Sequence, residues 1–280
     1  MAADAADPYA YPGTDVLRNK AGIRDPIKLE RFEYEQSYAR AREIRERPSP
    51  ARFDLKQLQH LHKHLFQDVY DWAGQIRTIE ITKGGSQFAR SDYIESEGKR
   101  MGDALEKANN LRGLEKTDFV RKLAEHYGDW NALHPFREGN GRATREFIGQ
   151  IARGAGYELD QTRIDNTKDQ WNEAARQSMV GQMHRIEEIF TTAIRHSRAV
   201  AFEHLSKAEA LQKHPELADA YAGLEAIEEA LKTRFPKNTK ALEGYKVSAT
   251  ESIIKQLDAG AVPSLTHTRQ TANKPPPERS

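Results

Sequence analysis

The chain has 280 residues and a formal net charge of +1. This length predicts one large domain or one domain with an appendage, and the near-zero charge excludes a whole-chain electrostatic attraction to nucleic acid or to a membrane surface. The absence of cysteine excludes a disulfide framework and a thiolate nucleophile. No run of about 18 apolar residues occurs, and the acidic N-terminus has no apolar stretch, so we expect neither a membrane span nor a secretory signal.

The first helices follow from spacing and from capping residues. Residues 1–25 are rich in Pro, Gly and Asp and are expected to be mostly irregular. Apolar residues at helical spacing predict a helix over residues 27–47, which Pro48 ends. Asp54 is expected to cap the next helix, with Gln57 as its capping-box partner.

A change of pattern over residues 74–94 predicts a small β-hairpin. Residues 74–82 alternate between polar and apolar side chains, residues 83–86 (Lys-Gly-Gly-Ser) have turn chemistry, and the pattern resumes at Gln87. We expect this hairpin to be the only strand structure in the chain.

Everything after the hairpin is predicted to be helical. Thr117 is expected to cap a helix, a further helix is expected over residues 141–153, and residues 169–198 predict one long helical stretch. Residues 203–258 predict two or three more helices. The buried face of the helix that Thr117 caps is predicted to consist of Phe119, Val120, Leu123, Tyr127 and Trp130.

The loop that opens the helix after His134 has the features of an anion site. A glycine-rich turn at Gly139-Asn140-Gly141 points several backbone N–H groups at one spot, with the dipole of the following helix behind them. Arg142 and Arg145 lie three residues apart on the first turns of that helix, so they share a face near the same anion. Two arginines beside such a nest favour a polyphosphate over a single phosphate.

Other residues of the same loop supply a base and a metal ligand. His134 can take a proton near pH 7, Glu138 can hold a Mg²⁺ ion that bridges phosphate oxygens, and Phe136 is expected to anchor the loop in the core. Each feature alone has a plain structural explanation: a helix end, a turn or a solvated helix face. Their co-occurrence within twelve residues favours phosphoryl or nucleotidyl transfer.

The stretch HPFREGNGRATR, residues 134–145, matches the signature HxFx(D/E)GNGRxxR of the Fic family at every fixed position, and the chain therefore resembles this family. The segments Phe66–Gly74 and Leu17–Ile23 also look like parts of Fic toxins and effectors, and the resemblance covers about residues 20–195. It implies an all-α fold, a Fic-like helical bundle with a small β-hairpin flap over the active site, to which a C-terminal helical appendage is added.

Four parts are expected along the chain. They are an irregular N-terminal segment over residues 1–25, a Fic domain over 26–200, a helical appendage over 201–260 and a disordered tail over 261–280.

The resemblance implies a protein adenylyltransferase, which transfers AMP from ATP to a hydroxyl of Ser, Thr or Tyr in a target protein. His134 resembles the general base and Glu138 the Mg²⁺ ligand. Asn140 looks like the side chain that holds the α-phosphate, beside the N–H groups of Gly139 and Gly141.

The remaining roles concern the outer phosphates and the target. Arg142 and Arg145 look like clamps for the β- and γ-phosphates. The flap is similar to the hairpin that binds the target segment by strand addition. Its residues are Thr82, Lys83, Gly84, Gly85, Ser86, Gln87 and Phe88.

Two other functions stay open at this point. One Fic sublineage transfers phosphate instead of AMP, but it has Lys where this chain has Gly141. A non-catalytic interaction protein that only binds nucleotide is the second alternative, and it would need neither His134 nor Glu138.

Regulation and partners are expected by the same resemblance. Fic proteins are commonly inhibited by a helix with the pattern (S/T)xxxE(G/N), whose Glu pairs with the second arginine of the loop, here Arg145. One match, Thr239–Gly244, gives Glu243 as the internal candidate, but we favour a separate small antitoxin. The target is expected to be a topoisomerase subunit or a GTPase, with no membrane and no direct nucleic acid, in the bacterial cytoplasm or in a host cell after secretion without a signal peptide.

Overall fold

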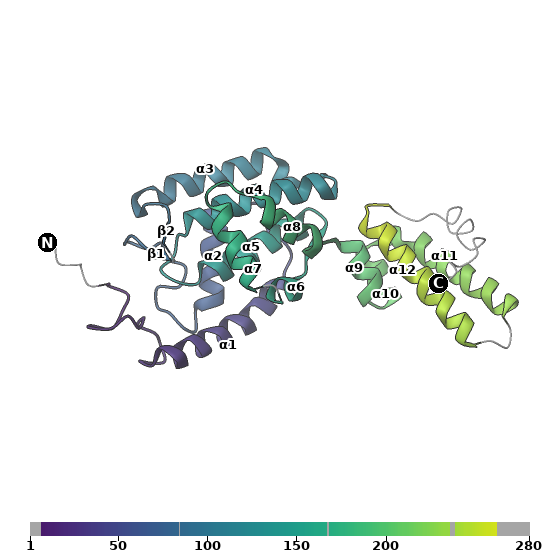
Figure 1. Ribbon diagram of the computed structural model, residues 1–280, viewed down its shortest axis with the longest axis horizontal. Coiled ribbons are helices and arrows are strands. Elements are labelled where there is room, and N and C mark those ends of the chain that lie inside the picture. The colour runs from purple at the N-terminus through teal and green to yellow at the C-terminus, as the bar shows by residue number, and fades with distance from the viewer. Residues whose placement is uncertain (1–6, 84, 167, 236–238, 262–280) are drawn as a thin grey trace. The chain divides into compact units, whose positions relative to one another are not determined.

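The computed structural model describes residues 7–83, 85–166, 168–235 and 239–261, which form two compact units (Figure 1). The first unit comprises the chain up to residue 155 together with residues 161–193. The second comprises residues 156–160 and everything from residue 194 onward. The expected boundaries of the four parts remain a proposal, and the expected disorder of the tail concerns residues outside the described ranges from 262 onward.

The first unit is a helical bundle with one small hairpin. Its elements are α1 (Pro26–Arg45), α2 (Leu55–Phe66), β1 (Thr82–Lys83), β2 (Ser86–Gln87), η1 (Ser91–Tyr93), α3 (Ile94–Lys107), η2 (Asn109–Leu111), α4 (Lys116–Leu133), α5 (Asn140–Gly154), α6 (Gln161–Asp165), α7 (Lys168–Ser178) and α8 (His184–Ala193).

Capping residues set where the first two helices begin. The side chain of Asp25 accepts hydrogen bonds from the backbone N–H groups of Ile27 and Lys28, and Pro26 occupies the first turn of α1. Asp54 accepts from the N–H of Gln57 at 3.0 Å, so the predicted cap of α2 is confirmed. The side chain of Gln57 donates to Gln150 Oε1 at 2.8 Å and does not complete the predicted capping box. Thr117, by contrast, lies inside the first turn of α4, whose N-cap is Glu115, so that predicted cap is wrong.

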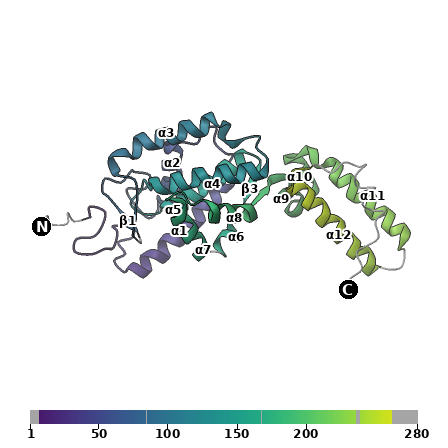
Figure 2. The same cartoon turned by 45° about the horizontal axis from the view of Figure 1, so that its top comes forward.

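Helix α5 lies at the centre of the first unit and packs against α1, α2 and α4 (Figures 1 and 2). Its side chains Phe147, Ile148 and Ile151 are fully buried. The predicted buried face of α4 is also confirmed: Phe119, Val120, Leu123, Tyr127 and Trp130 are each at most 5% exposed. Because α4 and α5 are both fixed in the core, the loop that joins them has rigid supports at its two ends.

The hairpin is shorter than the sequence pattern predicts. Strands β1 and β2 are antiparallel and pair Thr82 with Gln87 and Lys83 with Ser86, and Gly84 lies outside the described residues. The alternating residues 74–81 are not strand, because their backbone groups bond to loops: the N–H of Arg77 donates to Pro135 O and that of Thr78 to the Tyr9 hydroxyl.

The second unit contains a further two-stranded sheet, so the expectation of a single hairpin is wrong. Its elements are β3 (Tyr157–Leu159), β4 (Ile194–His196), α9 (Ser197–His204), α10 (Lys207–Lys213), η3 (Pro215–Leu217), α11 (Ala218–Arg234) and α12 (Thr239–Asp258). Strands β3 and β4 are antiparallel. Each has three residues, which is too short for alternation to be visible in the sequence.

The long helical stretch predicted over residues 169–198 is also wrong. It is divided into α7, α8, β4 and the start of α9. A turn after α7 places Gly181 at a φ of 81°, a conformation that a helix interior excludes. Among the described helices, none has both the length and the apolar character needed to cross a lipid bilayer.

Candidate active site

The loop between α4 and α5 turns sharply at both ends. His134 is the C-cap of α4 with φ 45° and ψ 61°, and Gly139 is the N-cap of α5 with φ 80° and ψ 3°. A Cβ on Gly139 would lie 2.4 Å from Cζ of Phe66, so only glycine fits this position. The first backbone N–H groups of α5 therefore lie at the end of this loop and have no acceptor within the helix. The positive end of the helix dipole lies behind them.

The side chain of Asn140 braces the loop. It is buried, accepts a hydrogen bond from the backbone N–H of Phe136 at 2.8 Å and donates one to the carbonyl of the same residue at 2.8 Å. Phe136 is fully buried, as predicted, and stacks on His62 with 3.8 Å between ring centroids. Asn140 thus has a structural task beside the α-phosphate contact expected of it, which remains a prediction.

Hydrogen bonding fixes the tautomer of His134. The Nδ1 atom lies 3.0 Å from the carbonyl oxygen of Asn131, and since a carbonyl can only accept, Nδ1 carries the proton. The proton-accepting nitrogen of the ring is therefore Nε2. The ring also stacks on Phe88, the flap residue that follows β2, with 3.6 Å between centroids, so two contacts orient the imidazole.

Glu138 is half-buried at the start of α5, and its Oε1 accepts a hydrogen bond from the N–H of Gly139 at 2.8 Å. The backbone of Glu138 is hydrogen-bonded to the buried His62. The N–H of Gly74 donates to Nδ1 of His62 at 2.8 Å, so Nε2 carries the proton and donates to the carbonyl of Glu138 at 2.9 Å. Burial lowers the pKa of His62 to about 4, so this histidine is neutral at pH 7.

Acid should weaken the fold through His62. Its pKa is depressed in the folded state, so its contribution to stability is fully present above about pH 6.5 and is lost as the pH falls toward 4. We expect the unfolding free energy of the wild type to fall by about 2 kcal/mol more between pH 7 and pH 5 than that of His62→Gln. Urea unfolding at the two pH values measures this difference, and equal losses would show that His62 does not titrate as described.

Arg142 is held by helix α1. Its guanidinium forms an ion pair with the carboxylate of Glu33 and donates to Ser37 Oγ at 3.0 Å, and it lies over the ring of Phe66. Glu33 also accepts a hydrogen bond from the Tyr70 hydroxyl. Burial, with the like charge of Arg145, lowers the pKa of Arg142 to about 10, which leaves it cationic at pH 7.

Arg145 contacts a carboxylate as well. Its Nη1 lies 2.5 Å from Oδ1 of Asp165 in α6, and its guanidinium is 5.8 Å from the centroid of the Trp171 ring. The side chain of Asp165 is 58% exposed, so water weakens this ion pair. Both arginines that the sequence assigns to phosphate are thus on the same helix and paired with acids from outside the loop.

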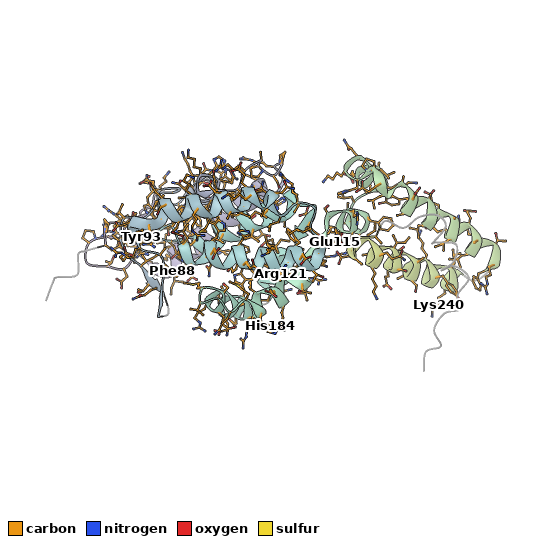
Figure 3. The ribbon with its side chains drawn as sticks, turned by 90° about the horizontal axis from the view of Figure 1, so that it is seen from above. Phe88, Tyr93, Glu115, Arg121, His184 and Lys240 are labelled. Carbon is orange, nitrogen blue, oxygen red and sulfur yellow. The ribbon has the colours of Figure 1, made fainter. Side chains whose placement is uncertain are left out.

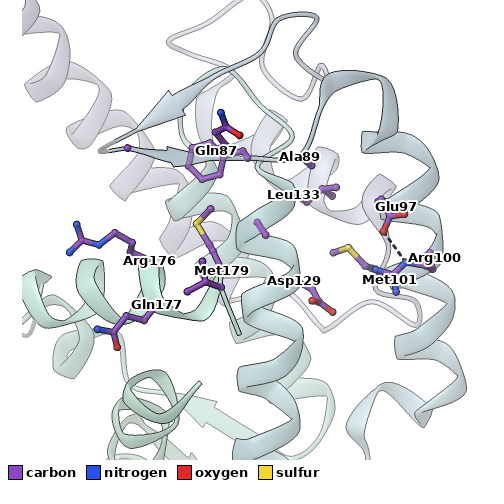
Figure 4. Close-up of a pocket in the computed structure, with 14 residues that line it drawn as sticks. Gln87, Ala89, Glu97, Arg100, Met101, Asp129, Leu133, Arg176, Gln177 and Met179 are labelled. Atoms are coloured by element: carbon purple, nitrogen blue, oxygen red, sulfur yellow. Dashed lines mark hydrogen bonds and ion pairs between the residues drawn. The ribbon is translucent and has the colours of Figure 1, made fainter. Parts of the chain in front are cut away.

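A groove of about 720 Å³ runs along the flap. It is lined by the end of the hairpin and by α3, α4 and α7, with Met101 and Leu133 among its apolar side chains (Figure 4). Phe88, labelled in Figure 3, lines the groove and also stacks on His134. Gly85, Gln87 and Phe88 of the predicted flap border this groove.

The model of the Fic/DOC family matches residues 52–152. A protein of Escherichia coli (strain K12) named "Probable protein adenylyltransferase Fic" is 40% identical over 191 residues, which are 68% of this chain and 94% of that protein. The chain belongs to the Fic/DOC family.

Two further relatives agree with this assignment to Fic. The protein adenylyltransferase VbhT of Bartonella schoenbuchensis is 44% identical over 159 residues, which are 57% of this chain and 33% of VbhT. The structure of BepC, a VirB-translocated effector protein of Bartonella tribocorum with bound AMPPNP, is 29% identical with a TM-score of 0.60 and covers 67% of this chain and 96% of that chain. The predicted Fic-like helical bundle with its hairpin is confirmed.

Sequence reasoning missed the residues outside the Fic loop that hold it. The sequence did contain an indication that Glu33 is buried, because this charged residue lies on the face of α1 that also carries the buried Leu29. No sequence pattern indicated the roles of Asp165 and Arg77. Glu243 is exposed in α12 of the second unit, and its predicted inhibitory role remains a proposal.

Proposed function

We propose that this chain is a protein adenylyltransferase, which transfers AMP from ATP to a hydroxyl of Ser, Thr or Tyr in a target protein. The observation that carries this proposal is the fixed tautomer of His134, whose basic Nε2 lies on the same short loop as the N–H groups that open α5. The protein adenylyltransferases among its relatives and the AMPPNP-bound BepC structure support it.

The proposed reaction proceeds in one displacement. His134 Nε2 takes the proton of the acceptor hydroxyl as its oxygen attacks the α-phosphorus of ATP. The new bond joins the target oxygen to the α-phosphorus, and the bond from the α-phosphorus to the bridging oxygen of the β-phosphate breaks. Pyrophosphate leaves, with its charge stabilised by the N–H groups at Gly139–Gly141 and by the guanidinium groups of Arg142 and Arg145.

The residues present fit a Mg²⁺ ion held by Glu138. The described residues contain no cluster of three or more metal-ligating side chains, but Mg²⁺ is commonly bound by one or two carboxylates together with substrate phosphates. Glu138 offers such a carboxylate beside the N–H of Gly139. When bound there, the ion supplies charge neutralisation on the phosphate oxygens.

AMP transfer is favoured over phosphate transfer by Gly141. This residue is exposed, and a Cβ built on it would meet no atom within 4 Å outside its own helix. The fold therefore does not require glycine here, while the open space suits α- and β-phosphates that lie along the loop.

We further propose that the chain acts as a toxin or effector that is inhibited by a separate small antitoxin, whose acidic side chain competes with the γ-phosphate for Arg145. A topoisomerase subunit and a GTPase remain the two candidate targets. Incubating a cell lysate with the chain, ATP and Mg²⁺, then mapping modified peptides by mass spectrometry, tests the proposal. AMP on a hydroxyl side chain is the expected product, and peptides that carry phosphate alone would favour the phosphotransferase.

Arg145→Ala should weaken ATP binding and leave AMP binding unchanged, because only ATP has a γ-phosphate to contact this guanidinium. Loss of one charge-assisted contact predicts a Kd for ATP about ten-fold higher or more. Calorimetry with both nucleotides measures the two affinities. Arg121→Ala, on the exposed face of α4, is the control, and equal weakening of ATP and AMP would contradict the assigned contact.

Glu243→Gly should leave the activity of the purified chain nearly unchanged if the inhibitor is a separate protein. Glu243 is exposed, and surface substitutions usually change stability by less than about 0.5 kcal/mol. If this residue were the internal inhibitor, relief of a coupling of about 1–3 kcal/mol would raise AMP transfer roughly 5- to 150-fold. Such a rise, measured with α-labelled ATP, would remove the need for an antitoxin.

A further inference from the structure

Arg77 is a buried arginine between the flap and the catalytic loop. Its side chain is 0% exposed, although a charged group is costly to bury unless its hydrogen bonds are satisfied. Arg77 lies three residues after Gly74, in a stretch whose pattern resembles a strand. The sequence therefore did not indicate that its side chain is buried.

The guanidinium of Arg77 joins three separate pieces of backbone. Its Nε donates to the carbonyl of His134 at 2.9 Å, its Nη1 to the carbonyl of Ile79 at 2.6 Å, and its Nη2 to the carbonyl of Ala89. Ile79 precedes β1 and Ala89 follows β2, so these two carbonyls mark the two ends of the flap. The planar fork of an arginine fixes the directions of its donors, so the spacing of the three carbonyls is fixed with it.

Neighbouring contacts also hold the base of the flap against the loop that contains His134. The N–H of Ala89 donates to the carbonyl of Ala132, two residues before His134. Glu80 lies 3.6 Å from Nη1 of Arg77 and accepts from both the N–H and the hydroxyl of Ser91, at 2.9 and 2.7 Å. The flap is thus attached to the catalytic loop at its base, while its strands β1 and β2 extend beyond these contacts.

We propose that Arg77 is a positioning residue that sets the register between the flap and His134, so that a hydroxyl of a polypeptide bound along β2 meets Nε2 of the base. This inference rests on the proposed function. A displacement of about 1 Å between reacting groups can lower a rate about 100-fold, so the spacing at the base of the flap matters for transfer to protein. Water, which attacks the α-phosphorus to give AMP and pyrophosphate, needs no flap and is less sensitive to this register.

The test compares wild type, Arg77→Lys and Arg121→Lys with α-labelled ATP. Arg121 is on the exposed side of α4 and receives the same substitution, so it is the matched control. Two products are measured in a cell lysate, each after subtraction of the amount formed by the lysate without the chain: label bound to protein and free AMP. We expect Arg77→Lys to lower the ratio of protein-bound label to free AMP about ten-fold or more, with the Kd for ATP within about two-fold of wild type. An unchanged ratio would overturn the proposal.

Amide hydrogen exchange gives a second readout that needs no activity. Arg77→Lys should speed exchange at Ala89, whose N–H lies at the base of the flap, and unchanged exchange there would also overturn the inference. If the wild type transfers no AMP, the proposed function fails, and the exchange result still decides the role of Arg77 in holding the flap.

A milder variant covers the case in which Arg77→Lys does not fold. Glu80 is the carboxylate partner of Arg77 in an ion pair, and its side chain is 58% exposed. Glu80→Gln therefore weakens the base of the flap without changing a buried side chain. We expect it to lower the same ratio about three-fold, since it removes a weaker part of the same attachment. A ratio of protein-bound label to free AMP equal to that of wild type would contradict the proposed role of this attachment in setting the register of the flap.

Discussion

His134→Ala is expected to lower AMP transfer at least about 100-fold, the usual scale for a positioned general base. The side chain is proposed to accept the hydroxyl proton at Nε2, a function that the N–H groups of the loop and the two arginines cannot replace. Binding of ATP should remain close to that of wild type, because the proposed phosphate contacts come from Gly139–Gly141 and the arginines.

The measurement pairs a transfer rate with a binding constant. Transfer is followed with α-labelled ATP and the Kd for ATP by calorimetry, with His184→Ala as the control. His184 is 85% exposed on α8, so its loss should change neither quantity. If His134→Ala keeps most of its transfer activity, a different group is the base.

Gly139→Ala is expected to destabilise the fold and abolish ATP binding, whereas Gly141→Ala should leave the fold intact. The added methyl at position 139 would meet the Phe66 ring at 2.4 Å in a backbone with φ 80°. Overpacking costs about 1–3 kcal/mol, and the left-handed backbone adds about 1–2 kcal/mol for a residue with a Cβ. At position 141 the same methyl enters open space and replaces a helical glycine, which is neutral or stabilising.

Urea unfolding of the two variants measures this contrast directly. A loss of about 2–5 kcal/mol for Gly139→Ala against little or none for Gly141→Ala is the predicted result. Equal stability of the two variants would show that the loop relaxes away from Phe66, and that the rigid nest described for the anion is wrong.

The catalytic loop could be predicted from the sequence because its parts are contiguous. His134, Glu138 and the glycines lie within a few residues, so local turn and helix chemistry places them together without knowledge of the rest of the fold. Caps such as Asp54 were predictable for the same reason, since the bond runs only three residues along the chain.

The supporting residues could not be predicted, because they reach the loop from distant segments. Arg77 meets His134 across 57 positions and Glu33 meets Arg142 across 109. The strands β3 and β4 were missed because the contact that makes them strands is also long-range, between Leu159 and Ile194 at the ends of two short segments. Pattern and propensity are local, so they do not report such contacts.

The loop around His134 is proposed to transfer AMP, which contains the α-phosphate of ATP, to a target protein. Purified chain and a cell lysate are incubated with Mg²⁺ and with ATP labelled at either the α- or the γ-phosphate, alongside His134→Ala. Above the label that the lysate incorporates without the chain, we expect additional protein-bound label from α-labelled ATP only, and at least about 100-fold less of it with His134→Ala. Label from γ-labelled ATP without label from α-labelled ATP would contradict AMP transfer and would identify the chain as a phosphotransferase.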